Sequence, residues 1–214
     1  MSQGQQARAP SAPAWPKDAL RIAFGVIWLI DATLKWLPGF RSSYMSVIMS
    51  EAQGQPGWLR PWFDFWIRFQ HPDAMFLAYL AAVIETLIAL ALIAGFARKL
   101  TYIAAIVFSL LIWGTAEGFG GPYTAGAADI GTAIIYAVVF AGLLMLSYYG
   151  GPARYSADYY LEKKISWWWR VAEVRRPEAP AAATLAPRGT VLAGAVPRPA
   201  QPADDLPAGH SDIA

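Results

Sequence analysis

Four long apolar segments are the feature that most constrains what this chain can fold into. They cover residues 19–37, 74–96, 100–117 and 129–149. Each is close to the 17–25 residues that an α-helix needs to cross the hydrocarbon core of a bilayer. Strands of a membrane β-barrel would instead alternate apolar and polar residues over about ten positions, and these segments do not alternate. The sequence therefore predicts an all-α membrane protein, built as a bundle of four transmembrane helices.

The overall composition agrees with a lipid environment and narrows the chemistry. Hydrophobic residues make up 56% of the chain and charged residues only 15%, against about 25% charged in soluble domains. The net charge of +2 is too small to indicate a nucleic-acid partner. The chain has no cysteine, which excludes a dithiol centre and a thiolate metal site. With His71 and His210 both outside the predicted spans, and with no flavin motif evident, we expect no haem, metal or flavin.

The segments outside the four predicted spans differ in composition, and each composition predicts a different kind of structure. Residues 1–18 are polar, and 19–150 hold the predicted transmembrane domain. Within the first outer loop, 58–70 is rich in Trp and Phe with charges on one helical stripe, which predicts an interfacial amphipathic helix. Residues 151–176 combine aromatic and basic residues, as interfacial anchors do. Residues 177–214 are rich in Ala and Pro, and we expect a disordered tail.

The distribution of basic residues predicts the orientation in the membrane. Arg98 and Lys99 lie in the connection between the second and third spans, and further basic residues follow the fourth span. The positive-inside rule then places both termini in the cytoplasm. Three basic residues of the first outer loop argue against this orientation: Arg41, Arg60 and Arg68.

Ionisable residues within the apolar segments are the first candidates for a site, because each costs about 2.5–3.5 kcal/mol to insert. Glu85 lies at the middle of the second span, so it is either neutral, paired or used in proton transfer. Asp31 and Lys35 are four residues apart in the first span, in the favourable order for an ion pair on one helix face. That pair either forms a site or only neutralises itself.

Further polar side chains are predicted at the outer end of the bundle. Trp113 and Glu117 share a helix face, Tyr123 lies in a glycine-rich hairpin, and Asp129 is expected to cap the fourth span. Together with Asp31 and Lys35 they would form a polar funnel above Glu85. Such a funnel suits protonation of a lipid-soluble molecule such as a quinone, and suits a proton-coupled permease almost equally well.

Three motifs at these residues resemble the DoxX/DoxD family. They are RIAFGVIWLIDATLKWLPGF (21–40), ETLIALALIAGFARKL (85–100) and LIWGTAEGFGGPYTAGAADIGTAIIYA (111–137). The chain looks most like the DoxD-type subunit of thiosulfate:quinone oxidoreductase. This resemblance implies four transmembrane helices, and electron transfer from thiosulfate to quinone as tetrathionate forms. It also implies a bacterial inner-membrane location and a separate DoxA-like partner subunit.

Two functional hypotheses follow. In the first, the chain is a membrane subunit that binds quinone, with Glu85 or Glu117 as the proton relay and Lys35 attracting the thiosulfate dianion. Asp31, Trp113, Tyr123 and Asp129 would complete the substrate-binding set. In the second, the chain is a non-enzymatic permease or a scaffold subunit of a respiratory complex. The lipid bilayer is a partner in both, together with a DoxA-like subunit or a second copy of the chain.

Overall fold

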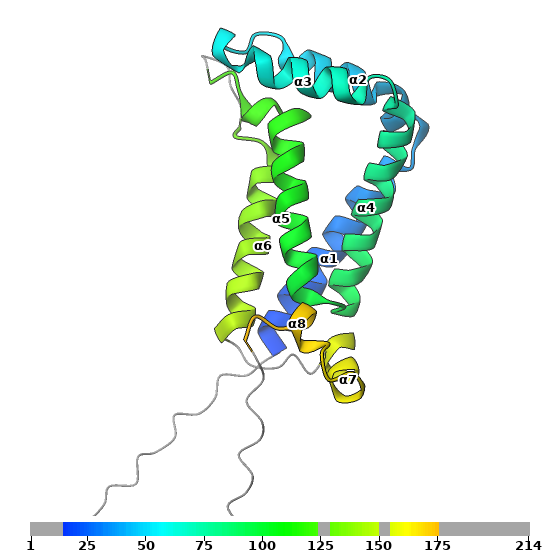
Figure 1. Ribbon diagram of the computed structural model, residues 1–214, viewed down its shortest axis with the longest axis vertical. Helices are drawn as coiled ribbons and strands as arrows, with labels where there is room; N and C mark the ends of the chain where they lie inside the picture. The colour runs from blue at the N-terminus through cyan, green and yellow to red at the C-terminus, as the bar shows by residue number, and fades with distance from the viewer. Residues whose placement is uncertain (1–14, 124–128, 150–154, 176–214) are drawn as a thin grey trace, which may run out of the picture. The chain divides into compact units, whose positions relative to one another are not determined.

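The computed structural model describes residues 15–123, 129–149 and 155–175, and these ranges contain helices, turns and no strand (Figure 1). Residues 1–14 of the predicted N-terminal segment and the whole predicted disordered tail lie outside the described residues, while residues 15–18 belong to the first helix. The α-helices are α1 (Trp15–Lys35), α2 (Pro38–Ala52), α3 (Arg60–Gln70), α4 (Ala74–Ala94), α5 (Arg98–Thr115), α6 (Thr132–Tyr149), α7 (Ala157–Lys164) and α8 (Trp169–Ala172).

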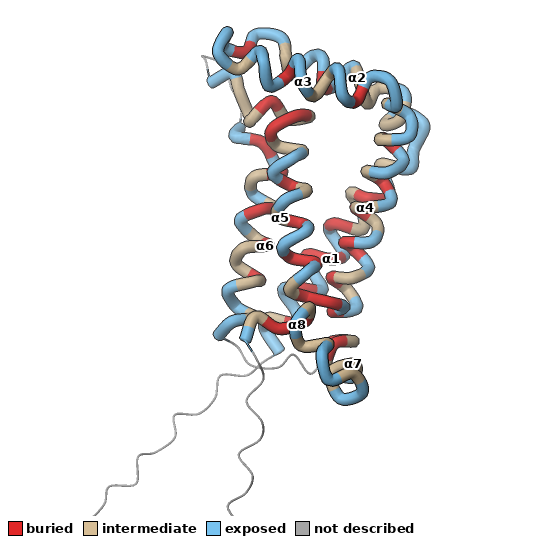
Figure 2. Tube along the Cα trace, viewed as in Figure 1, coloured by how far each residue is buried: buried red, intermediate tan, exposed pale blue. Residues whose placement is uncertain are grey.

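Three of the described helices, α4, α5 and α6, are long and apolar enough to cross a membrane. Exposed positions, pale blue in Figure 2, recur along these helices. They include large apolar residues such as Leu87 (61% exposed), Val107 (56%) and Val138 (65%). Apolar surface of this extent suits contact with lipid. α1 has 21 residues, but charged residues occupy its first two turns and its last turn. The fourth span and the cytoplasmic position of the termini therefore remain predictions.

Small residues hold the long helices close together in two pairs, α1 with α4 and α5 with α6. Between α1 and α4, a Cβ added to Gly25 would lie 2.9 Å from Leu92 Cβ. Ala105 and Ala137 are buried on α5 and α6. Small residues allow this close approach of helix backbones. Phe24 and Trp28 of α1 meet Phe140 and Tyr136 of α6, with ring centroids 5.0 Å apart in each pair, and so contribute to a core shared by the two pairs.

Two helices cross the end of the bundle above α4 and α5 (Figure 1). Pro38 and Gly39 directly follow the predicted first span, and they form the first turn of α2. Proline suits that position because its missing N–H would have no helical partner there. α3 begins at Arg60, within the range predicted as an amphipathic helix, and buries Phe63. Whether α3 lies at the membrane surface remains a prediction.

At the opposite end, a buried arginine ties α7 and α8 to the start of α5. The carboxylate of Asp158 accepts hydrogen bonds from the backbone N–H groups of Ala97 (2.7 Å) and Arg98 (2.9 Å). The same carboxylate accepts hydrogen bonds from Arg98 Nε (3.0 Å) and from Trp168 Nε1 (2.8 Å). Glu173 also pairs with Arg98. Asp158 therefore caps α5 from 60 residues away.

Candidate functional site

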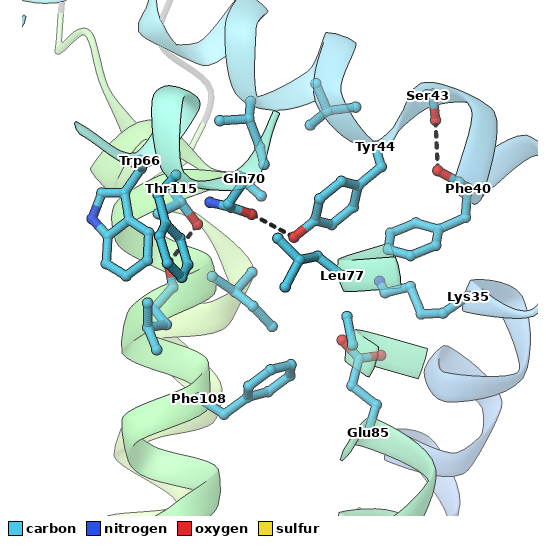
Figure 3. A pocket seen from close by; sticks show the side chains of 17 residues that line it. Lys35, Phe40, Ser43, Tyr44, Trp66, Gln70, Leu77, Glu85, Phe108 and Thr115 are labelled. Atoms are coloured by element: carbon cyan, nitrogen blue, oxygen red, sulfur yellow. Dashed lines mark hydrogen bonds between the residues drawn. The ribbon is translucent and has the colours of Figure 1, made fainter. Parts of the chain in front are cut away.

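A cavity of about 210 Å³ lies between the two crossing helices and the ends of α1, α4 and α5 (Figure 3). Its walls are largely apolar, and they combine α2 and α3 with one face of α4 and one face of α5. The lining side chains that matter most for chemistry are Lys35, Tyr44, Trp66, Gln70, Glu85 and Thr115. Sequence analysis predicts two of these six as site residues, Lys35 and Glu85.

Glu85 forms the polar floor of the cavity. Leu77, Ala81 and Glu85 are spaced four residues apart on α4, which places them on one face of that helix, and all three line the cavity. Glu85 is only 2% exposed, and its Oε2 has no hydrogen-bond partner among the described residues. A buried polar atom without a partner is uncommon in a folded protein, and a ligand in the cavity would supply one.

Lys35 reaches the same cavity from the end of α1. Its Nζ lies 3.6 Å from Asp31 Oδ2 and 5.2 Å from the centre of the Phe40 ring. Figure 3 shows the ammonium group and the Glu85 carboxyl at the edge of one shared space. The predicted Asp31–Lys35 pair is therefore present, and it lies beside Glu85. The neighbouring Asp31 carboxylate opposes the approach of a dianion to Lys35.

A second polar pair, which the sequence does not reveal, forms the opposite wall. The Tyr44 hydroxyl of α2 donates a hydrogen bond to Gln70 Oε1 of α3, at 2.5 Å (Figure 3). Burial raises the pKa of Tyr44, so the hydroxyl keeps its proton across the physiological range. Sequence reasoning misses the pair because it treats the α2 segment as a loop. The only available signal is a polar residue at the end of the amphipathic α3 segment.

The other predicted site residues lie at the hairpin that joins α5 to α6, and none of them lines this cavity. Trp113 Nε1 donates to the Ile130 carbonyl at 2.8 Å, and Asp129 Oδ1 accepts from the Gly131 N–H at 2.7 Å. The Tyr123 hydroxyl donates to the carbonyl of Phe119, also in the hairpin. These bonds link residues within and between the two described ends of the hairpin. The polar funnel expected above Glu85 therefore separates into a hairpin cluster and the Lys35–Asp31 pair.

Glu117 caps α6, which begins at Thr132 and not at the predicted Asp129. Its two carboxylate oxygens accept from the Ala133 N–H at 2.9 and 3.2 Å. Gly131 makes room for this contact, because a Cβ there would lie 2.6 Å from Glu117 Oε2. The cap satisfies an N–H group that has no partner within the helix. The geometry thus gives Glu117 a structural role beside the predicted proton relay.

We expect Glu117→Ala to lower the free energy of unfolding by about 1 kcal/mol, because the first turn of α6 loses its acceptor. Glu117→Gln should retain most of that stability, since an amide oxygen can still accept from Ala133. Thermal midpoints in detergent and hydrogen exchange at the Ala133 amide measure both effects. If the Gln variant keeps its midpoint but loses quinone-dependent activity, Glu117 is a proton relay and not only a cap.

The cavity has the size and polarity to hold one substituted ring. An apolar cavity of about 150 Å³ is enough to bind benzene, and this one is larger, with polar groups on two walls. Lys35 and Gln70 can donate hydrogen bonds to oxygen atoms of a ligand, and Glu85 can exchange a proton with it. Within the described ranges, His, Asp and Glu form no cluster that could hold a metal ion.

Comparison with known proteins gives one match. The DoxX family model matches residues 17–118, which run from α1 to the end of α5 and include every residue that lines the cavity. No curated protein and no solved structure matches the chain. The match covers just under half of the chain, so residues 17–118 are similar to the DoxX family, and this similarity together with the three apolar helices indicates a membrane protein.

Proposed function

We propose that the domain binds the ring of a quinone in the cavity and acts as the membrane subunit of a quinone-linked oxidoreductase. The observation that carries this proposal is the buried carboxyl of Glu85, whose Oε2 has no hydrogen-bond partner among the described residues, on the wall of a largely apolar, ring-sized cavity. An apolar pocket with a few convergent polar groups is the usual form of a small-molecule site. A quinone fits both the apolar walls and the polar groups of the cavity, since its ring is apolar and its two oxygens accept hydrogen bonds.

The proposed reaction balances two electrons against two protons. Two thiosulfate ions would join through a sulfur–sulfur bond to form tetrathionate and release two electrons. The quinone takes up these electrons together with two protons and becomes a quinol. Lys35 would donate a hydrogen bond to one ring oxygen and stabilise the negative charge that develops there. Glu85 would deliver a proton to the reduced ring, because its carboxyl lines the same cavity.

We place the oxidation of the sulfur compound away from this cavity. Asp31, 3.6 Å from Lys35, makes the cavity unfavourable for a dianion. Lys35 therefore fits a neutral quinone better than it fits thiosulfate, which differs from the role that the sequence suggests for it. A DoxA-like partner subunit or a second copy of the chain would then supply the sulfur site and pass the electrons on.

Filling the cavity tests the proposal. Ala81 lines the cavity, whereas Val83 on the same helix is 39% exposed. Ala81→Phe should therefore weaken binding of a short-chain quinone at least tenfold, and Val83→Phe should leave it unchanged. Quenching of tryptophan fluorescence measures the affinity, since Trp66 lines the cavity. Absence of quinone binding by the wild-type chain would refute the proposal and favour the permease or scaffold function.

A further inference from the structure

The fold sorts the charges of residues 155–175 by sign. This stretch contains three acids, Asp158, Glu162 and Glu173, and all three turn toward the buried Arg98. Asp158 Oδ2 lies 3.0 Å from Arg98 Nε, and Glu162 Oε1 lies 4.0 Å from Arg98 Nη2. The side chains of the three acids are only 0%, 17% and 8% exposed, in the same order. Most of the negative charge of this stretch is thus withdrawn from its surface.

The basic residues of the same stretch are all exposed: Lys163, Lys164, Arg170 and Arg175. Within the described part of the chain none of them forms an ion pair, and three of them lie over aromatic rings. Lys163 Nζ is 3.8 Å from the centre of the Tyr159 ring, and Arg175 is 5.0 Å from that of Tyr148. By sequence the stretch has four basic and three acidic residues, a net charge of +1, but its surface presents mainly the four cations.

Burial strengthens this asymmetry at Glu162, the most exposed of the three acids. Burial, aided by the nearby Glu173, raises the pKa of Glu162 to about 7, although Arg98 opposes the shift. A carboxyl with that pKa is only partly charged at neutral pH. The surface around α7 and α8 therefore carries still less negative charge than the sequence suggests.

The position of the stretch indicates what these cations meet. It docks where α4 ends and α5 begins, through Asp158 and Arg98, so it lies at one end of two candidate spans. The stretch carries exposed aromatic residues of its own, Tyr155 (70% exposed), Tyr160 (62%) and Trp167 (54%), and Tyr149 at the end of α6 is 77% exposed. Tyrosine and tryptophan are enriched at the level of lipid headgroups. Cations at that level attract anionic lipids.

We propose that residues 155–175 form a binding surface for anionic lipid headgroups, with Lys163, Lys164, Arg170 and Arg175 as the contacts. The buried Arg98 makes this surface possible, because it gathers the acids that would otherwise neutralise it. The surface is independent of the quinone cavity, which lies at the other end of α5. Its ligand is defined by charge, as a lipid of the surrounding bilayer whose headgroup carries a net negative charge.

The test compares two lipids and two matched double variants of the full chain. Fluorescence transfer from tryptophan to dansyl-labelled phosphatidylglycerol, in micelles of neutral detergent and phosphatidylcholine, reports binding. The wild-type chain should prefer phosphatidylglycerol to phosphatidylcholine. Lys163→Gln with Lys164→Gln should weaken binding of phosphatidylglycerol about tenfold or more, since each basic residue contributes about 1 kcal/mol. Raising the salt concentration should reduce the preference of the wild-type chain.

Arg60→Gln with Arg68→Gln is the control, because it removes two exposed cations from α3 at the other end of the bundle. This control should keep the preference for phosphatidylglycerol. Equal losses in the two double variants would overturn the proposal, because the effect would then follow total charge and not this surface. A wild-type chain with no preference between the two lipids would also overturn it, and would favour an acidic protein as the partner.

Discussion

Replacing Arg98 by methionine should lower the free energy of unfolding by about 3–5 kcal/mol, the usual cost of removing one partner from a buried ion pair. Arg98 is 3% exposed and faces Asp158, Glu162 and Glu173. Without the guanidinium group, three carboxyls would share one buried space. Repulsion and desolvation should then drive 155–175 away from α5.

Two measurements and two controls test the role of Arg98. The thermal midpoint in detergent should fall, and trypsin should cut more rapidly at Lys163 and Lys164 once α7 leaves the bundle. Lys99→Met removes the same charge from the next residue and should change neither result. Adding Glu173→Gln to Arg98→Met should restore part of the stability, because one of the unpaired acids disappears. An unchanged midpoint in Arg98→Met would show that the cluster does not hold this end together.

This cluster also illustrates what the sequence could not reveal. The interfacial prediction for 151–176 rests on its aromatic and basic residues, which are local features. Asp158 and Arg98 are 60 residues apart, and nothing in either segment indicates that one caps the other. The same holds for Glu117, whose partner Ala133 lies 16 residues away across the hairpin. Caps supplied by distant carboxylates have no local pattern, so they emerge only from the structure.

Only some of the polar residues that line the cavity could be predicted from the sequence. Glu85 and Lys35 are prominent in the sequence because a charge within an apolar segment is costly, and a position near mid-span can be read from length alone. Tyr44 and Gln70 are ordinary residues in segments that connect the spans. Tyr44 and Gln70 are 26 residues apart in the sequence. They become part of the site only because α2 and α3 cross the bundle and bring the two side chains into contact. The apolar spans and the α3 segment could be predicted as helices, but neither the helix α2 nor this crossing could.

Glu85→Gln should reduce quinone turnover by about 10²–10⁴-fold, the range that general acid catalysis contributes. The amide fills the same space and can form hydrogen bonds, so the variant should fold and bind quinone with nearly unchanged affinity. It lacks a proton to transfer at neutral pH. The loss should therefore appear in kcat, with little change in KM for quinone, as expected for an interaction that matters in the transition state.

Thiosulfate-dependent quinone reduction, in membranes that contain equal amounts of each full-length variant, measures this effect. Asp31→Asn is the matched control, because Asp31 is a nearby carboxylate that pairs with Lys35 but does not line the cavity. It should retain turnover within a small factor, while Glu85→Gln should not. Full turnover in Glu85→Gln would exclude Glu85 as the proton donor. Lys35 would then remain as the group that donates a hydrogen bond to the quinone ring oxygen. Equal losses in both variants would instead indicate that the local charge balance controls the reaction, since each substitution removes one potential negative charge near Lys35.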